Sequence, residues 1–305
     1  MNDIYLRTAR LLTQVAPSVF VDETFALKGG TAINLFYRDM PRLSVDLDLV
    51  FCDYTLSRTA AVAKIDTSIR AMAERLRAQG FTTSTPLTID SESKLIVRGD
   101  DITVKVEVNT VMRGTVNPVR IAALTPHASD VLKADLELPV ASFEDTYGGK
   151  LAAALDRQHP RDLFDVLQLF EHEGITPAIR RAFVVYVASH NRPVHELLYP
   201  VEADIEFAYY GSFAGMTASQ VPLSELLAAR TRMMTELQTG LDTQERTFLL
   251  ALVAGDQECE LSDVPHVSQL PGVRWKQHNL EKLRRTNPSK FAEQYAKLAE
   301  RFDGG

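Results

Sequence analysis

Two carboxylates stand out because their spacing could serve chemistry on phosphate. Asp46 and Asp48 lie two positions apart in Val45 to Phe51, where apolar and acidic residues alternate and predict a strand with one polar face. Two carboxylates on one face repel each other unless a cation lies between them, and hard oxygen ligands suit Mg²⁺, with Mn²⁺ as an alternative. A solvated strand face is the other interpretation of an Asp-x-Asp pair.

A glycine pair precedes these carboxylates. Gly29-Gly30-Thr31 lies between a predicted strand, Phe25 to Lys28, and a predicted helix, Thr31 to Arg38. Glycine permits close approach of the backbone, and the amides at a helix start favour a phosphate, although such turns also carry glycine for backbone reasons alone. Glu107 projects from a second alternating strand, 102–109, and could complete a metal shell or be a surface residue.

Cationic residues recur later in the chain, where the pattern predicts helices. Lys150 and Arg157 are seven residues apart, nearly two helical turns, so they share one face of the predicted helix 144–157. Pro160 predicts an elbow before the next helix, 161–172. A lysine beside a bound triphosphate would neutralise its charge. Alternatively, these charged residues form a salt-bridge cluster that only stabilises the junction of the two helices.

The second of these helices carries two aspartates with different expected roles. Arg161 and Asp165 are four residues apart and can pair across one turn. We expect Asp165 to orient Lys150 or contact the substrate, and Asp162 to face elsewhere on the helix.

The order of these features resembles polymerase β-like nucleotidyltransferases: Gly-Gly-Thr, a helix, an Asp-x-Asp strand and a later acidic strand. More specifically, the chain resembles the AbiEii/MenT family of nucleotidyltransferase toxins of type IV toxin–antitoxin systems. Fourteen residues (32–45) separate the glycine turn from Asp46, more than is usual in that family, and a longer helix or loop would absorb them. The resemblance rests on Lys28–Ala32, Arg42–Leu49, Lys150–Asp165 and Pro271–Leu280.

This resemblance implies a Mg²⁺-dependent enzyme that transfers NMP from an NTP to an acceptor hydroxyl and releases pyrophosphate. Metal would be held by Asp46, Asp48 and Glu107, with Glu107 also accepting the hydroxyl proton. Lys150 would compensate phosphate charge and Asp165 would complete the catalytic set. The implied nucleotide-binding residues are Lys28, Gly29, Gly30, Thr31, Ser44, Arg157 and Arg161.

The acceptor and partners are also expectations from the resemblance. It implies transfer to the tRNA 3′ end, growth arrest, and a cognate antitoxin protein, with no DNA partner. Two alternatives stay open: transfer to a small molecule or a protein hydroxyl, and a non-catalytic relative that acts by binding a partner. Intact Asp46, Asp48, Glu107 and Lys150 count against the second alternative.

Length and element pattern indicate two domains in the 305-residue chain. We predict an α+β protein with a polymerase β-like α/β nucleotidyltransferase domain over 1–142. A mainly helical domain over 143–305 would contribute Lys150 and Asp165 to the active site. The region Pro126 to Pro139 is the expected boundary, although Val119 to Ala123 and Glu137 to Ala141 could still form strands. Two cysteines and no long apolar run favour a cytoplasmic protein without a membrane segment.

The net charge of −7 argues against a general nucleic-acid coat, but the charge is uneven. Glu196 to Asp263 contains 12 acidic and 3 basic residues, whereas Val273 to Arg301 contains 8 basic and 3 acidic residues. This basic tail, which includes Lys276, could contact an RNA backbone or meet the acidic segment within the fold. Trp275 is expected to be a buried anchor of the tail.

Overall fold

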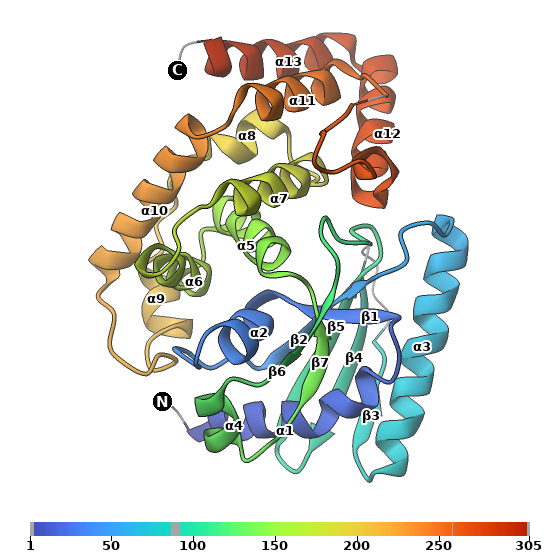
Figure 1. Ribbon diagram of the computed structural model, residues 1–305, viewed down its shortest axis with the longest axis vertical. Coiled ribbons are helices and arrows are strands. Elements are labelled where there is room, and N and C mark those ends of the chain that lie inside the picture. Colours follow the sequence, from blue (N-terminus) through green and yellow to red (C-terminus); the bar gives the residue numbers. More distant parts are fainter. Residues whose placement is uncertain (1–2, 87–91, 258, 304–305) are drawn as a thin grey trace. The chain divides into compact units, whose positions relative to one another are not determined.

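The computed structural model describes residues 3–86, 92–257 and 259–303 and divides into two compact units (Figure 1). The first unit comprises Met1–Thr146 and the separate segment Ser212–Val221; the second comprises Tyr147–Gly211 and Pro222–Gly305. The predicted domain division after residue 142 stays a prediction.

The first unit is built on a mixed sheet of seven strands within the described residues, in the order β3-β4-β5-β2-β1-β7-β6. Its central strand β2 pairs antiparallel with β1 and parallel with β5. The strands are β1 (Phe25–Lys28), β2 (Asp46–Phe51), β3 (Thr82–Ser84), β4 (Glu92–Gly99), β5 (Ile102–Asn109), β6 (Arg120–Ala123) and β7 (Glu137–Val140).

Helices of this unit begin where the sequence supplies caps or glycines. Ser57 caps the longest helix by accepting a hydrogen bond from the Ala60 amide. The helices are α1 (Asp3–Val19), α2 (Gly29–Ala32), α3 (Arg58–Ala78) and α4 (Pro126–Leu132), and a π-helical segment, Ile33–Tyr37, continues α2. The helix predicted over 31–38 therefore begins at Gly29, two residues before the predicted start, and becomes π-helical at Ile33.

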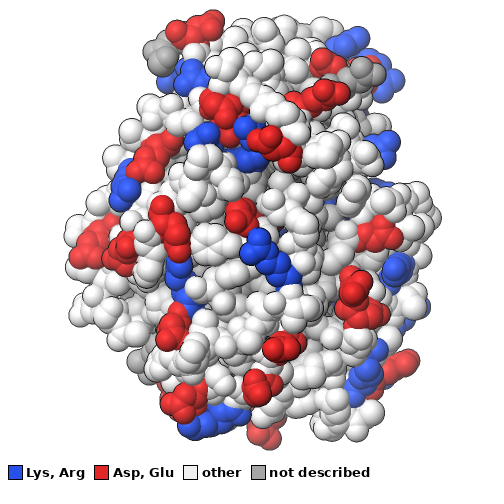
Figure 2. Space-filling model, in the orientation of Figure 1, with Lys and Arg blue, Asp and Glu red and all other residues white. Residues whose placement is uncertain are grey.

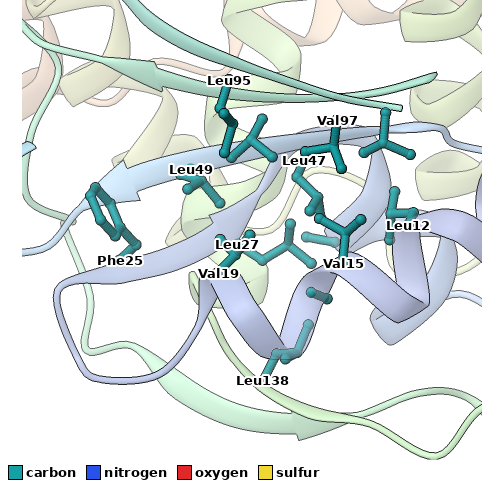
Figure 3. Close-up of a cluster of buried hydrophobic side chains, with 14 of the residues drawn as sticks. Leu12, Val15, Val19, Phe25, Leu27, Leu47, Leu49, Leu95, Val97 and Leu138 are labelled. Atoms are coloured by element: carbon teal, nitrogen blue, oxygen red, sulfur yellow. The ribbon is translucent and has the colours of Figure 1, made fainter. Parts of the chain in front are cut away.

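The main core of the first unit lies on one face of the sheet. Leu12, Val15 and Val19 of α1 meet side chains of β1, β2, β4 and β7 there (Figure 3). Leu47 and Leu49 are fully buried in this core. Each such side chain contributes about 1.5–3 kcal/mol by leaving water.

The alternation along β2 places the acidic residues on the opposite face. Since successive side chains of a strand point to opposite faces, Asp46 and Asp48 share the face that the core does not occupy. The predicted polar face of this strand is thus confirmed, and hydrophobic burial of Leu47 and Leu49 holds it in place.

One expected boundary in this unit is wrong. The region Pro126–Pro139 is not a linker, because it forms α4 and most of β7 and belongs to the first unit. β7 pairs with both β1 and β6, so its backbone hydrogen bonds are part of the sheet. Prolines in this region begin a helix and sit inside a short strand instead of marking a domain junction.

The second unit is helical, as expected, and the two predicted helices, 144–157 and 161–172, are present at Phe143–Arg157 and Pro160–Glu171. In the basic tail, one helix begins at Pro271 and the next begins at Pro288. The helices are α5 (Phe143–Arg157, whose first turn belongs to the first unit), α6 (Pro160–Glu171), α7 (Pro177–Ala188), α8 (Val194–Leu198), α9 (Glu206–Ser212), α10 (Leu223–Thr239), α11 (Thr243–Ala254), α12 (Pro271–Thr286) and α13 (Pro288–Asp303), with a 3₁₀ turn at Val267–Gln269.

A lipid bilayer could not be spanned by any helix in the described ranges, because none combines sufficient length with enough apolar residues.

The two faces of β2 predict opposite responses to substitution. Leu49→Ala should lower the free energy of unfolding by about 2–5 kcal/mol, because a fully buried leucine leaves a cavity. Asp48→Asn, its neighbour on the polar face, should change it by less than about 1 kcal/mol. Urea unfolding followed by circular dichroism measures both values. Equal losses would contradict the assignment of the two faces.

Candidate active site

The glycine turn lies directly against the second aspartate of β2. Gly29 has a φ of +74°, and a Cβ at this position would lie 2.5 Å from Asp48 Oδ2. Such a separation is shorter than any van der Waals contact, so a side chain at position 29 would displace the Asp48 carboxylate. The structure therefore brings the predicted turn and one predicted metal ligand together.

Thr31 and Ser44 connect the same turn to the start of β2. Thr31 is 1% exposed, and its Oγ1 lies 2.9 Å from Ser44 Oγ and 2.5 Å from the carbonyl oxygen of Asp46. Both hydroxyls therefore hold the turn to the strand. Their contact with a nucleotide stays a prediction. The observed hydrogen bonds position the glycine turn against β2.

Four charged residues form a row across neighbouring strands. Lys28 of β1 is opposite Asp48 of β2, Asp48 is opposite Glu107 of β5, and Glu107 is opposite Lys94 of β4. Directly opposed residues point to the same face of a sheet, so Glu107 shares a face with Asp46 and Asp48. Glu107 Oε1 also lies 3.2 Å from Lys94 Nζ.

This donor set suits a hard cation in part. Asp46 and Asp48 supply carboxylate oxygens from one face, the ligand type that Mg²⁺ prefers. Glu107 is engaged by Lys94. Among the described side chains, no three or more from His, Cys, Asp and Glu are gathered closely enough to hold a metal ion. The two aspartates therefore suit a metal ion as ligands. Glu107 could be a third ligand only if its ion pair with Lys94 were broken.

Arg42 is a site neighbour to which the sequence analysis gave no role. Its side chain is buried, its Nη1 donates to the Leu43 carbonyl oxygen at 2.9 Å, and its Nη2 would lie 2.7 Å from a Cβ on Gly30. A side chain at Gly30 would thus press on this guanidinium, as one at Gly29 would press on the Asp48 carboxylate. The one sequence feature that could have indicated this role is the position of Arg42 in the motif Arg42–Leu49, just before the acidic strand.

The residues around Arg42 are held by a distant part of the chain. The Leu43 amide donates to the Met216 carbonyl oxygen, the Ala218 amide donates to the Pro41 carbonyl oxygen, and Arg42 and Thr217 form an antiparallel bridge. Segment Ser212–Val221 therefore positions the approach to β2. No local pattern in this segment indicates such pairing, so sequence reasoning missed it.

Lys150 is the centre of a buried ion cluster in the second unit. Its Nζ lies 2.8 Å from Asp162 Oδ1 and 3.0 Å from Asp165 Oδ2, and all three side chains are at most 5% exposed. The prediction that Asp165 orients Lys150 agrees with this contact. The prediction that Asp162 faces elsewhere is wrong, because the elbow before α6 turns its first-turn carboxylate onto α5.

Arg157 completes the cluster from the next turns of α5. Its Nε and Nη2 donate to Asp162 Oδ2 and Oδ1 at 2.5 and 2.9 Å, so Lys150 and Arg157 share a helix face as predicted. Burial alone would raise the pKa of Asp162, but the charge of Lys150 and the hydrogen bond from Arg157 outweigh it and hold that pKa well below its ordinary value. The Arg157 side chain is 61% exposed and is the cation of the cluster that faces solvent.

The elbow between α5 and α6 is fixed by its own polar contacts. His159 Nδ1 accepts from the Arg161 amide at 3.1 Å and caps α6. Gln158, which has a positive φ, donates to the Val201 carbonyl oxygen and accepts from the Ala203 amide. Arg161 begins α6 on the half-exposed surface, and its contact with a nucleotide stays a prediction.

The C-terminal motif has a structural explanation. Lys276 is buried, and its Nζ donates to the carbonyl oxygens of His190 and Arg192. Burial lowers the pKa of Lys276 to about 8. The expectation that Lys276 contacts RNA is therefore wrong. Trp275 is half-buried and stacked on His278, so it is less deeply buried than predicted.

Comparison with known proteins agrees with these motifs. The family model "Nucleotidyl transferase AbiEii toxin, Type IV TA system" matches residues 10–276. A solved structure of MenT4, a nucleotidyltransferase toxin from Mycobacterium tuberculosis, is similar with a TM-score of 0.59 and 19% identity, covering 96% of this chain and 94% of that chain. At this identity the likeness concerns the fold, and the predicted α+β class is confirmed. No curated protein matches the chain in sequence.

The contact between Gly29 and Asp48 predicts a position-specific effect of alanine. Gly29→Ala and Gly80→Ala both place a side chain at positive φ, which costs about 1–2 kcal/mol of stability. Only Gly29→Ala also displaces the Asp48 carboxylate, since Gly80 has no neighbour within 4 Å. Pyrophosphate release should fall in Gly29→Ala alone. Equal release by both variants would show that the turn is structural only.

The Asp162 cluster predicts an acid-dependent stability. A carboxyl whose folded pKa lies below its unfolded value of about 3.9 stabilises the protein above that pH and loses this stabilisation as the pH falls further. Asp162→Asn should lower the free energy of unfolding at pH 7 by about 3 kcal/mol and make its decline below pH 5 shallower. The variant Asp135→Asn, at an exposed carboxylate with no ion pair among the described residues, should alter neither quantity measurably, as followed by urea unfolding across pH.

Proposed function

Because the chain belongs to the AbiEii family of nucleotidyltransferase toxins of type IV toxin–antitoxin systems, we propose that it transfers NMP from an NTP to the 3′ hydroxyl of tRNA. The observation that carries the catalytic part is the close approach of Gly29 to Asp48, which joins the two motifs that define such enzymes. Growth arrest and restraint by a cognate antitoxin protein belong to the same proposal and rest on the family.

The carboxylates of the first unit would divide the chemistry. Asp46 and Asp48 would hold Mg²⁺, which when bound polarises the phosphoryl group and neutralises its charge. The acceptor oxygen attacks the α-phosphorus, the bond from that phosphorus to the β-phosphate oxygen breaks, and pyrophosphate leaves. Glu107 would take the hydroxyl proton after exchanging its contact with Lys94, or would serve as a further metal ligand.

The remaining residues would bind and orient the nucleotide. Gly29 to Thr31 would present backbone amides to the phosphates, with Lys28 and Ser44 beside them. By the family pattern, Lys150 would stabilise the developing negative charge, with Asp165 as its positioning partner. Arg157 and Arg161 would contact phosphates, and the exposure of Arg157 supports this role.

The tRNA acceptor is proposed from the family resemblance, and the charge pattern on one face of the molecule bears on how RNA would be held. The face in Figure 2 carries Lys and Arg interspersed with Asp and Glu, without an extended area of one sign. RNA held there would contact a limited number of phosphates, so recognition would rely on the 3′ end more than on a long backbone contact.

The central test is a transfer assay with the purified protein. Total RNA and each labelled NTP are incubated with and without Mg²⁺, and we expect labelled tRNA only with the metal. RNA oxidised by periodate, which lacks a 3′ hydroxyl, should stay unlabelled. Label in protein or in small molecules would support the alternative acceptors instead.

The aspartate pair supplies the matched variants for this assay. Asp48→Asn removes an anionic ligand and should reduce transfer by a factor of about 1,000 or more. Asp53→Asn, just beyond β2, keeps its turn with Thr55 and should retain full transfer. Undiminished transfer by Asp48→Asn at any Mg²⁺ concentration would overturn the mechanism.

A further inference from the structure

A second place in the molecule has the properties of a binding site. A cavity of about 510 Å³ lies in the second unit, between α12 and the turn that follows α11. This volume is in the range of small-molecule and cofactor sites, about 300–1,000 Å³. Its walls include Gly255 and Gln257 from the turn and Arg274, His278, Glu281 and Arg284 from α12.

The helix contributes one continuous face to this cavity. Positions 274, 278, 281 and 284 are spaced by three or four residues, so their side chains lie on one side of α12. The other side of the helix is packed by Val273, Lys276 and Leu280, which are buried. The cavity-lining side chains are therefore held on a helix that is itself anchored.

The wall opposite α12 is the turn after α11, and contacts from α12 hold this turn in place. Gln277 is 5% exposed, and its Nε2 donates to the carbonyl oxygens of Asp256 and Gln257 at 3.2 and 3.3 Å. Gly255 ends α11 with a φ of +87°, and a Cβ there would lie 3.7 Å from Arg284 Nη1. These contacts fix the turn beside the helix, so the cavity needs little rearrangement to accept a ligand.

The charge of the lining favours an anion. Within the described residues, the Arg274 side chain makes no hydrogen bond or ion pair. Glu281 lies 3.8 Å from Arg284 and 3.5 Å from Arg285, so the cavity lining carries two arginines, Arg274 and Arg284, and one carboxylate that is already paired. Arg284 also lies near the carbonyl end of α11, which a cation stabilises. That structural role accounts for Arg284 and leaves Arg274 unexplained.

An aromatic pair adjoins the charged groups. Trp275 and His278 are stacked, with ring centroids 5.8 Å apart and an interplanar angle of 23°. Planar rings beside guanidinium groups are the combination that binds nucleotides without sequence preference, through stacking and phosphate contacts.

We propose that this cavity binds a phosphate group of a nucleotide-sized ligand through Arg274 and Arg284, with the sugar or base beside His278. The phosphate could belong to an RNA strand or to a free nucleotide, and both share this chemistry. The RNA source rests on the proposed function, whereas phosphate binding at the cavity does not.

The chain offers a direct reporter, because Trp275 is its only tryptophan. Tryptophan emission of the full chain is titrated without Mg²⁺ with three probes: pyrophosphate, ATP and a single-stranded RNA oligonucleotide. We expect a saturable change in emission. Arg274→Gln with Arg284→Gln should weaken binding at least about tenfold. Lys282→Gln removes an exposed charge from the same helix outside the cavity and should bind as the parent does.

The outcomes are distinct. A response to RNA that is much stronger than that to ATP, and that weakens with salt by about 0.7 in log–log slope per phosphate contact, assigns the site to an RNA strand. The reverse order assigns it to a free nucleotide. No response to any probe, or equal affinity in the double variant, overturns the proposal. Since the titration involves no transfer, it can fail while the transfer assay succeeds, and the reverse.

Discussion

The first unit depends on one steric constraint, the contact of a glycine backbone with a carboxylate on the central strand. Gly29 can lie against Asp48 only while β1 and β2 keep the register that places Lys28 opposite Asp48. A shift of one residue would exchange Asp48 for Leu47 or Leu49 on the polar face and bury a charge in the core. The apolar core thus fixes the positions of the acidic residues, although those residues lie on the opposite face of the sheet.

The buried cluster around Lys150 follows a different logic. Two cations and two carboxylates balance, so the cluster is neutral, and each charge is compensated by contacts of 2.5–3.0 Å. Such clusters add little net stability compared with apolar packing, but removing one member leaves a buried charge and is costly. Its value lies in fixing where α5 and α6 meet, and Arg157 is the member that remains accessible to a ligand.

Sequence reasoning succeeded where local chemistry determines local structure. Strict alternation placed Asp46 and Asp48 on one face of β2, and the spacing of seven residues placed Lys150 and Arg157 on one face of α5. It failed for Asp162, because the direction of that side chain depends on the elbow between two helices, a tertiary feature. It also failed for the buried Lys276, since a lysine held by backbone carbonyls has the same sequence signature as an exposed one. The role of Arg42 could not be predicted, because its position depends on pairing with the distant segment Ser212–Val221.

The pairing of Ser212–Val221 with residues 41–43 has a consequence for how the protein is made. On a ribosome, the amide of Leu43 has no Met216 partner until residues 147–211 of the second unit have been synthesised. The approach to the acidic strand is therefore incomplete in every nascent chain that ends before residue 221. A contiguous fragment ending at Thr146 would lack the same partner, so the first unit cannot be obtained by simple truncation.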